Sequence, residues 1–79
     1  MKILITGFTG FVSQHFLTLL NEMEPGSSVL GIDKNEPDFN FSNFPELNIS
    51  FENIDLLNKE ATGKILTDFK PEYILHLAS

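Results

Sequence analysis

A short apolar run followed by two closely spaced glycines begins the chain and limits its fold more than any other stretch. Residues Lys2 to Thr6 are rich in β-branched apolar side chains, which is the pattern of a parallel strand covered on both faces. Gly7 and Gly10 follow at once, and from Phe11 onward the apolar residues recur with a helical period. Gly7 permits a turn in backbone conformations closed to residues with a Cβ, and Gly10 allows the main chain to approach closely. The stretch therefore predicts a strand, a glycine turn and a helix.

This arrangement is suited to binding an anion. The free N–H groups and the positive end of the helix dipole point at one spot beyond the strand. In a strand-turn-helix that opens a βαβ unit, the expected anion is a dinucleotide pyrophosphate. The spacing is Gly7-x-x-Gly10-x-x-Ser13, so a serine stands where a third glycine would allow the closest packing. We expect slightly looser packing there, with the serine hydroxyl bonded to the preceding turn. From this stretch alone, a glycine turn without a ligand is the alternative.

Composition limits the classes of function. A chain of 79 residues forms at most one small domain of marginal stability. A net charge of −6 argues against nucleic acid or an anionic membrane as a partner, because both require a basic patch. The absence of cysteine excludes disulfides, thiolate metal sites and thiol catalysis, and no metal site is predicted. No apolar run approaches the ~20 residues of a membrane span, so we expect a soluble cytoplasmic protein.

The apolar residues after the glycine turn predict a helix over about residues 10–22. They recur at i, i+4, i+7, i+8 and i+11, so we expect them to form one buried stripe against the sheet. The residues of this stripe are Val12, Phe16, Leu19, Leu20 and Met23. Pro25 and Gly26 end the helix.

Strands and helices alternate along the rest of the chain. The expected elements are a strand over 28–33, a loop over 34–47, a strand over 48–53, a helix over 58–69 and a strand over 73–77. Prolines interrupt the loop, yet Phe39, Phe41 and Phe44 indicate that it packs on the domain or contacts another chain. The element order predicts an α/β fold with a four-stranded parallel sheet of order 3-2-1-4. One helix covers each face, which makes half of a doubly wound sheet.

Acidic residues lie at the ends of two of the strands, at the edge where such a sheet binds ligands. Asp33 lies about one βαβ unit after Gly7, where a carboxylate accepts hydrogen bonds from both hydroxyls of an adenosine ribose. Its charge would repel a 2′-phosphate by roughly a few kcal/mol at an effective dielectric of about 20. NAD is therefore favoured over NADP, although Lys34 offsets part of the repulsion. A turn-starting role is the alternative for Asp33, and a solvated turn is the alternative for Asp55.

Three segments in combination carry a family resemblance. Residues 5–12 read Ile-Thr-Gly-Phe-Thr-Gly-Phe-Val, residues 29–33 read Val-Leu-Gly-Ile-Asp, and residues 71–79 read Pro-Glu-Tyr-Ile-Leu-His-Leu-Ala-Ser. They resemble the N-terminal part of the extended short-chain dehydrogenase/reductase family, the NAD-dependent sugar-nucleotide epimerases and dehydratases. The resemblance implies a Rossmann fold that binds NAD, and a parent reaction by transient hydride transfer on a sugar nucleotide.

The resemblance also implies roles for individual residues. The glycine turn would hold the pyrophosphate and ribose through backbone groups. Asp33 would bind the adenosine ribose, and Asp55 would lie near the adenine. The end of the fourth strand would pass along the cofactor. The residues that would contact the cofactor are Gly7, Phe8, Gly10, Phe11, Val12, Asp33, Asp55, Leu56, Leu77, Ala78 and Ser79. His76 is interpreted as a positioning or packing residue, and His15 as a packed or surface residue.

The catalytic residues of that family have no match in this sequence. The only tyrosine, Tyr73, is followed four places later by Leu77, so no Tyr-x-x-x-Lys pair is present. We therefore expect the N-terminal portion of a Rossmann domain, truncated after the fourth strand, without a substrate domain and without activity of its own. A non-catalytic dinucleotide-binding or redox-sensing module is the alternative. The open edge of the fourth strand also predicts a homo-oligomer, since parallel strands need neighbours on both sides.

Overall fold

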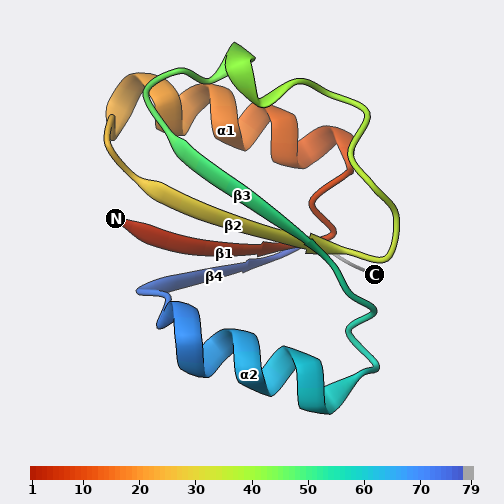
Figure 1. The fold of residues 1–79 in the computed structure, drawn as a ribbon. Coiled ribbons are helices and arrows are strands. Elements are labelled where there is room, and N and C mark those ends of the chain that lie inside the picture. Colours follow the sequence, from red (N-terminus) through yellow and green to blue (C-terminus); the bar gives the residue numbers. More distant parts are fainter. Residues whose placement is uncertain (78–79) are drawn as a thin grey trace.

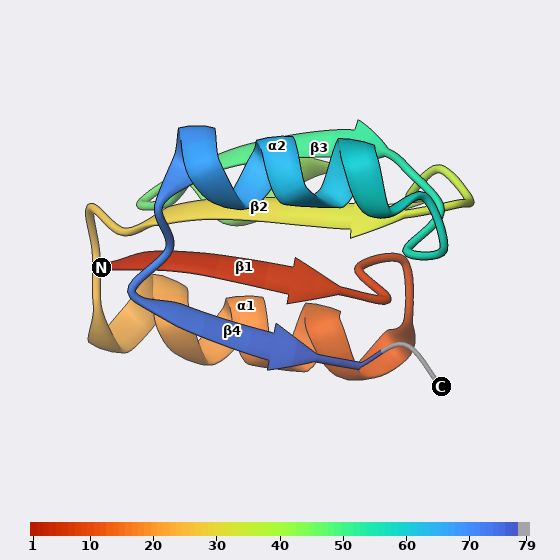
Figure 2. The same cartoon turned by 90° about the horizontal axis from the view of Figure 1, so that it is seen from below.

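The computed structural model describes residues 1–77 and forms a parallel sheet between two helices (Figure 1). The elements are β1 (Lys2–Thr6), α1 (Phe11–Met23), β2 (Ser28–Asp33), the 3-10 turn η1 (Phe41–Asn43), β3 (Asn48–Asn53), α2 (Lys59–Phe69) and β4 (Tyr73–His76). The strand order is β3-β2-β1-β4, and every neighbouring pair is parallel. Helices α1 and α2 lie on opposite faces of this sheet (Figures 1 and 2). The predicted α/β fold and strand order are confirmed.

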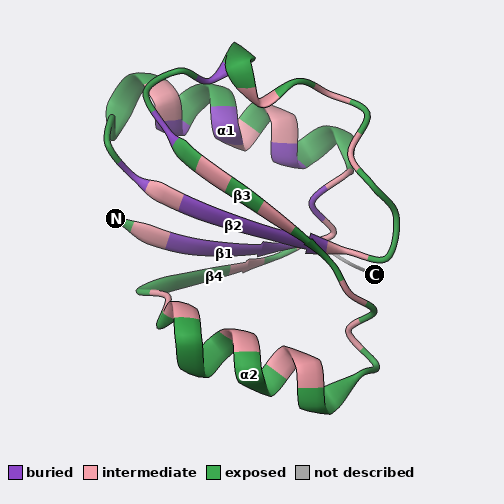
Figure 3. Ribbon diagram, in the orientation of Figure 1, coloured by how far each residue is buried: buried purple, intermediate pink, exposed green. Residues whose placement is uncertain are grey.

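Strand β1 is the centre of the sheet. It pairs with β2 on one side and with β4 on the other. Its residues Ile3, Leu4 and Ile5 are at most 3% exposed, because both faces of the strand are covered. Strand β4 is mostly exposed by contrast (Figure 3). The carboxyl ends of β1 and β2 therefore lie next to the most firmly packed part of the molecule.

The buried stripe of α1 differs from the one that the sequence predicted. Val12, Leu19 and Met23 are 60%, 56% and 73% exposed, so the prediction was wrong for these three side chains. The buried residues of α1 are Ser13, Leu17 and Leu20. The helix is therefore turned so that a small polar residue, rather than Val12, meets the sheet.

Ser13 explains this orientation. Its side chain is fully buried, and its hydroxyl donates to the carbonyl of Phe8 and, at 2.9 Å, to the carbonyl of Gly10. The predicted bond to the preceding turn is confirmed. The side chain is inaccessible to solvent, and the expected slightly looser packing stays a prediction. A rule based on apolar period counts serine as polar, so it cannot place Ser13 in a helix–strand contact.

The loop between β2 and β3 packs on the domain, which was one of the two predicted possibilities, and it lies on the same face as α1. Phe44 is 6% exposed, and the rings of Phe39 and Phe41 lie 5.4 and 5.8 Å from the ring of Phe8. Phe8 itself is completely buried, and Gly31 of β2 lies against its ring. A Cβ at Gly31 would fall 2.1 Å from Cγ of Phe8, so only glycine leaves room for this ring.

Helix α2 covers the other face more thinly. Asn58 caps its N-terminus by accepting from the N–H of Ala61 at 3.1 Å. Ile65 and Phe69 pack on a small cluster formed by Leu4, Leu30 and Ile32.

Within residues 1–77, no helix has both the length and the apolar character needed to cross a membrane.

Candidate dinucleotide site

The glycine turn leads directly from β1 into α1. Gly7 has φ 67°, a left-handed conformation that favours glycine, and its carbonyl accepts from the N–H of Gly10 at 3.2 Å. A Cβ at Gly10 would lie only 3.3 Å from that carbonyl oxygen. Both observations agree with the sequence-based prediction that Gly7 permits the turn and that Gly10 allows a close approach of the main chain.

The N-terminus of α1 is open to a ligand. Gly10 is its N-cap residue; within the described residues no side chain caps the helix, and the first turn contains no acidic residue. Phe11 and Val12, the first two residues of the helix, are 74% and 60% exposed. First-turn N–H groups have no partner within a helix, and the helix dipole adds a partial positive charge there. This helix end is therefore suited to an anionic group.

Phe8 belongs to the hydrophobic core rather than to the surface of the turn. Its side chain is completely buried among the loop phenylalanines, and its N–H donates to the carbonyl of Ile32 at 3.4 Å. The ring therefore ties the turn to β2 and the loop. The Phe8 carbonyl in turn accepts from the hydroxyl of Ser13, so both backbone groups of Phe8 already have partners within the chain.

Asp33 is held in place at the end of β2. Its Oδ2 accepts from the hydroxyl of Thr9 at 2.7 Å and from the N–H of Thr9 at 3.1 Å. Its Oδ1 accepts from the N–H of Asn35 at 3.0 Å. A carboxylate has acceptor capacity for about four hydrogen bonds, so these contacts orient the group without exhausting it.

These contacts determine the charge state of Asp33. Partial burial on its own would raise the pKa of the carboxyl group. Hydrogen bonds from Asn35 and Thr9 outweigh that effect and hold the pKa of Asp33 below its ordinary value of 3.8. The group is thus a carboxylate at neutral pH, ready to accept hydrogen bonds from hydroxyl groups.

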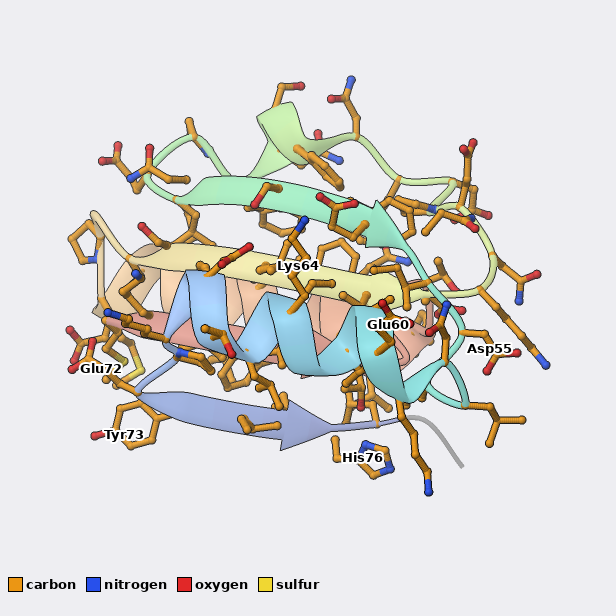
Figure 4. The ribbon with its side chains drawn as sticks, turned by 60° about the horizontal axis from the view of Figure 1, so that its bottom comes forward. Asp55, Glu60, Lys64, Glu72, Tyr73 and His76 are labelled. Carbon is orange, nitrogen blue, oxygen red and sulfur yellow. The ribbon has the colours of Figure 1, made fainter. Side chains whose placement is uncertain are left out.

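A cavity of about 360 Å³ joins several of the predicted residues. Its lining residues are Gly7, Ile32, Asp33, Lys34, Ile54, Asp55, Leu56, Leu57 and His76. Figure 4 shows Asp55 and His76 at the same end of the sheet, whereas Glu72 and Tyr73 lie at the opposite end. The lining thus combines apolar residues of β2 and of the segment after β3 with ionisable side chains.

Apart from Phe8, the predicted residues that the structure describes fall into three groups in space. Gly7, Asp33, Asp55 and Leu56 line the cavity. Gly10, Phe11 and Val12 form the open helix end next to the turn. Leu77 follows β4 and donates its N–H to the carbonyl of Thr6 at 3.0 Å, whereas Ala78 and Ser79 lie outside the described residues.

Asp55 also has a local structural role. Its Oδ1 accepts from the N–H of Leu57 at 2.9 Å, and its carbonyl accepts from the N–H of Asn58. These bonds form the turn that leads into α2. The side chain is exposed, so the turn and a ligand contact are compatible.

Sequence reasoning missed the threonines that support the site. Thr9 binds Asp33 across 24 positions of sequence, and Thr6 binds His76 across 70. A hydroxyl residue between two turn glycines was a possible signal for Thr9. No local pattern links Thr6 to His76, because their contact follows from the parallel register of β1 and β4.

The described residues contain no group of three or more ionisable side chains that could hold a metal.

Comparison with known proteins agrees with this geometry. The NAD dependent epimerase/dehydratase family matches residues 3–79. The dTDP-D-glucose 4,6-dehydratase of Dictyostelium discoideum is 32% identical over 82 residues, which cover 99% of this chain and 19% of that protein. The curated relatives are thus much longer, and the chain spans about a fifth to a quarter of their length.

Solved structures show the same fold. UDP-glucose 4-epimerase from Thermotoga maritima, solved with UDP-glucose, superimposes with a TM-score of 0.75 at 30% identity, covering all of this chain and 24% of that one. The dTDP-glucose 4,6-dehydratase of Bacillus anthracis, solved with NAD, gives a TM-score of 0.78 at 20% identity, covering all of this chain and 27% of that one. The chain is therefore a member of the NAD-dependent epimerase/dehydratase family, within the extended short-chain dehydrogenase/reductases.

Proposed function

We propose that this chain is the dinucleotide-binding portion of an NAD-dependent sugar-nucleotide epimerase or dehydratase. The main support is the uncapped N-terminus of α1 beside a carboxylate that Thr9 holds in place. An open helix end suits a pyrophosphate, and a fixed carboxylate at the end of β2 suits a ribose. Family membership is consistent with both roles.

The cofactor would lie along the carboxyl ends of the strands. Backbone groups of the turn from Gly7 to Val12 would bind the pyrophosphate, and Asp33 would accept from the adenosine ribose hydroxyls. Asp55 and Leu56 would border the adenine, and Leu77 would lie beside the rest of the cofactor. The ionised Asp33 would repel the 2′-phosphate of NADP, so NAD is the expected cofactor.

The substrate and reaction are assigned to the longer protein of which this chain would be the first part. Relatives are named for dTDP-glucose and UDP-glucose, so a sugar nucleotide is the expected substrate, oxidised transiently at a ring hydroxyl. The bound nicotinamide would accept and return the hydride. The chain has no Tyr-x-x-x-Lys pair, and we expect it to be inactive alone and cytoplasmic. A non-catalytic dinucleotide-binding or redox-sensing module is the second candidate, and a downstream sequence without that pair would favour it.

Calorimetric titration of the chain with NAD tests the cofactor assignment. We expect weak binding by the wild type, weaker binding of NADP, and loss of the NAD signal in Asp33→Ala. Asp38→Ala removes an exposed carboxylate from the loop and serves as the control for net charge. Equal heats for the wild type and Asp33→Ala would remove Asp33 from the site.

We also propose that copies of this chain associate through β4. In the described sheet β4 is an edge strand, and Tyr73 and Ile74 are each 58% exposed. With Leu19 and Met23 of α1 they border an apolar groove of about 460 Å³. Sedimentation equilibrium should give a dimer for the wild type and a monomer for Ile74→Lys, and a monomeric wild type would contradict the proposal.

A further inference from the structure

Two polar side chains meet where β1 and β4 end, outside the set of residues that the family resemblance assigns to the cofactor. Thr6 and His76 are register partners in the parallel pair, and Oγ1 of Thr6 lies 2.6 Å from Nδ1 of His76. Thr6 is 3% exposed, whereas His76 is exposed and lines the same cavity as Asp33 and Asp55. The buried hydroxyl thus holds one nitrogen of an imidazole whose other nitrogen has no hydrogen-bond partner among residues 1–77.

The surroundings of Thr6 determine the direction of this hydrogen bond. Within residues 1–77, His76 is the only partner of the Thr6 hydroxyl. If Nδ1 carried the proton and donated it, the hydroxyl hydrogen of Thr6 would be buried without an acceptor, at the cost of its desolvation. If Thr6 donates, its hydrogen is satisfied and Nδ1 is the acceptor. The neutral imidazole then carries its proton on Nε2.

We propose that Thr6 fixes His76 in the Nε2–H tautomer, and that His76 thereby offers a hydrogen-bond donor to an oxygen of the bound dinucleotide. This inference rests on the proposed NAD site and adds to it a binding residue from β4 and a positioning residue from β1.

The chemistry of the cavity supports this role. Its lining includes the carboxyl groups of Asp33 and Asp55, whose oxygens are hydrogen-bond acceptors. A dinucleotide also presents phosphate and ribose oxygens, which need donors. His76 supplies a donor on the β4 side of the cavity, whose lining also includes Gly7, Asp33 and Asp55.

The first test measures the tautomer in the chain without ligand. Two-dimensional ¹H–¹⁵N correlation of the imidazole rings, in alkaline buffer in which imidazole is neutral, should show Nδ1 of His76 as an unprotonated acceptor and Nε2 as protonated. Thr6→Val should give averaged signals, and Thr6→Ser should restore the fixed tautomer. His15, whose ring packs edge-on against Phe11, is the internal reference. Averaged His76 signals in the wild type would overturn the role of Thr6, whether or not NAD binds.

The second test measures binding of NAD by calorimetry. Loss of one hydrogen bond should raise the Kd of His76→Ala three- to tenfold, which corresponds to the net free-energy contribution of one such bond. His76→Gln, whose amide nitrogen can replace Nε2, should retain most of the affinity, whereas His76→Asn should not. Thr6→Val should weaken binding as His76→Ala does, and the two changes together should cost no more than one. If Asp33→Ala abolishes binding while His76→Ala leaves Kd unchanged, the site stands and the donor role of His76 fails. If wild-type NAD binding is absent, or equal to that of Asp33→Ala, the proposed function fails instead.

Discussion

The two faces of the sheet differ in how firmly they are packed. On the α1 face, the loop phenylalanines and the helix bury a continuous cluster; its members are Ile3, Ile5, Phe8, Leu17, Leu20, Val29, Phe44 and Leu47. On the α2 face the buried cluster consists of Leu4, Leu30 and Ile32, and none of the described residues of α2 is itself fully buried (Figure 3). We call the α1 face the dense face and the α2 face the thin face. Phe8 and Ser13 attach the glycine turn to the dense face, whereas Asp55 and His76 border the thin face.

This difference explains how the site is supported. The turn and the start of α1 are fixed by side chains inside a packed core, so their backbone groups are held before any ligand arrives. The outer wall of the cavity depends on a few hydrogen bonds and on partly exposed apolar contacts. Substitutions on the dense face should therefore affect stability first, and those at the thin face should affect binding more than stability.

The largest effect is expected at Gly31. A side chain there would overlap the ring of Phe8, so Gly31→Val must expel that ring from the core. We expect a loss of about 3–5 kcal/mol in the free energy of unfolding, as for deletion of a buried aromatic ring. Urea denaturation followed by circular dichroism measures it. Gly63→Ala in α2, where a Cβ meets nothing within 4 Å, should stabilise by up to about 1 kcal/mol. Equal effects of the two changes would refute the contrast between the faces.

A pair of leucines compares the two helices directly. Leu17 of α1 is fully buried, whereas Leu66 of α2 is 37% exposed. Leu17→Ala should therefore cost about 2–4 kcal/mol through lost burial and a residual cavity, and Leu66→Ala less than about 1 kcal/mol. Chemical denaturation of both variants gives the comparison. A larger loss for Leu66→Ala would mean that the α2 face contributes more than its burial indicates.

The smallest effect concerns the pH dependence at Asp33. Its pKa is lowered in the folded chain, so the unfolded chain binds its proton more readily. The resulting stabilisation is present above the unfolded value of about 3.9 and is lost as the pH falls through the folded pKa. Unfolding free energies of the wild type and Asp33→Asn should therefore converge as the pH drops below about 4. A difference independent of pH would show that Thr9 and Asn35 do not favour the charged form.

The sequence was sufficient for the fold where several levels agreed. The apolar run, the glycine turn and the acid at residue 33 predicted β1, α1 and β2, and the alternation of elements predicted the strand order. The face of α1 was not predictable from period alone, because Ser13 is buried through hydrogen bonds to carbonyls in the turn. The packing of Phe8 on Gly31 was also missed. It depends on a contact between segments 23 residues apart, which no local pattern encodes.

Within the site, sequence reasoning identified the polar residues at the ends of strands. It missed the threonines whose hydrogen bonds orient these residues. Asp33 was identified by its position, but its hydrogen bonds to Thr9 depend on how the turn folds back over β2. Likewise His76 was recognised at the end of the fourth strand, while its bond to Thr6 required the register of two strands. Supporting contacts of this kind arise from tertiary structure, so they need coordinates.

The most direct test of the central claim is an amide NMR titration of the chain with adenosine and then with NAD. If the turn binds the pyrophosphate, adenosine should shift only amides around the cavity at Asp33 and Leu56. NAD should in addition shift those of Gly10, Phe11 and Val12. Should NAD leave these three amides unmoved, or move them no more than adenosine does, the helix end would not be a pyrophosphate site and the account would be contradicted.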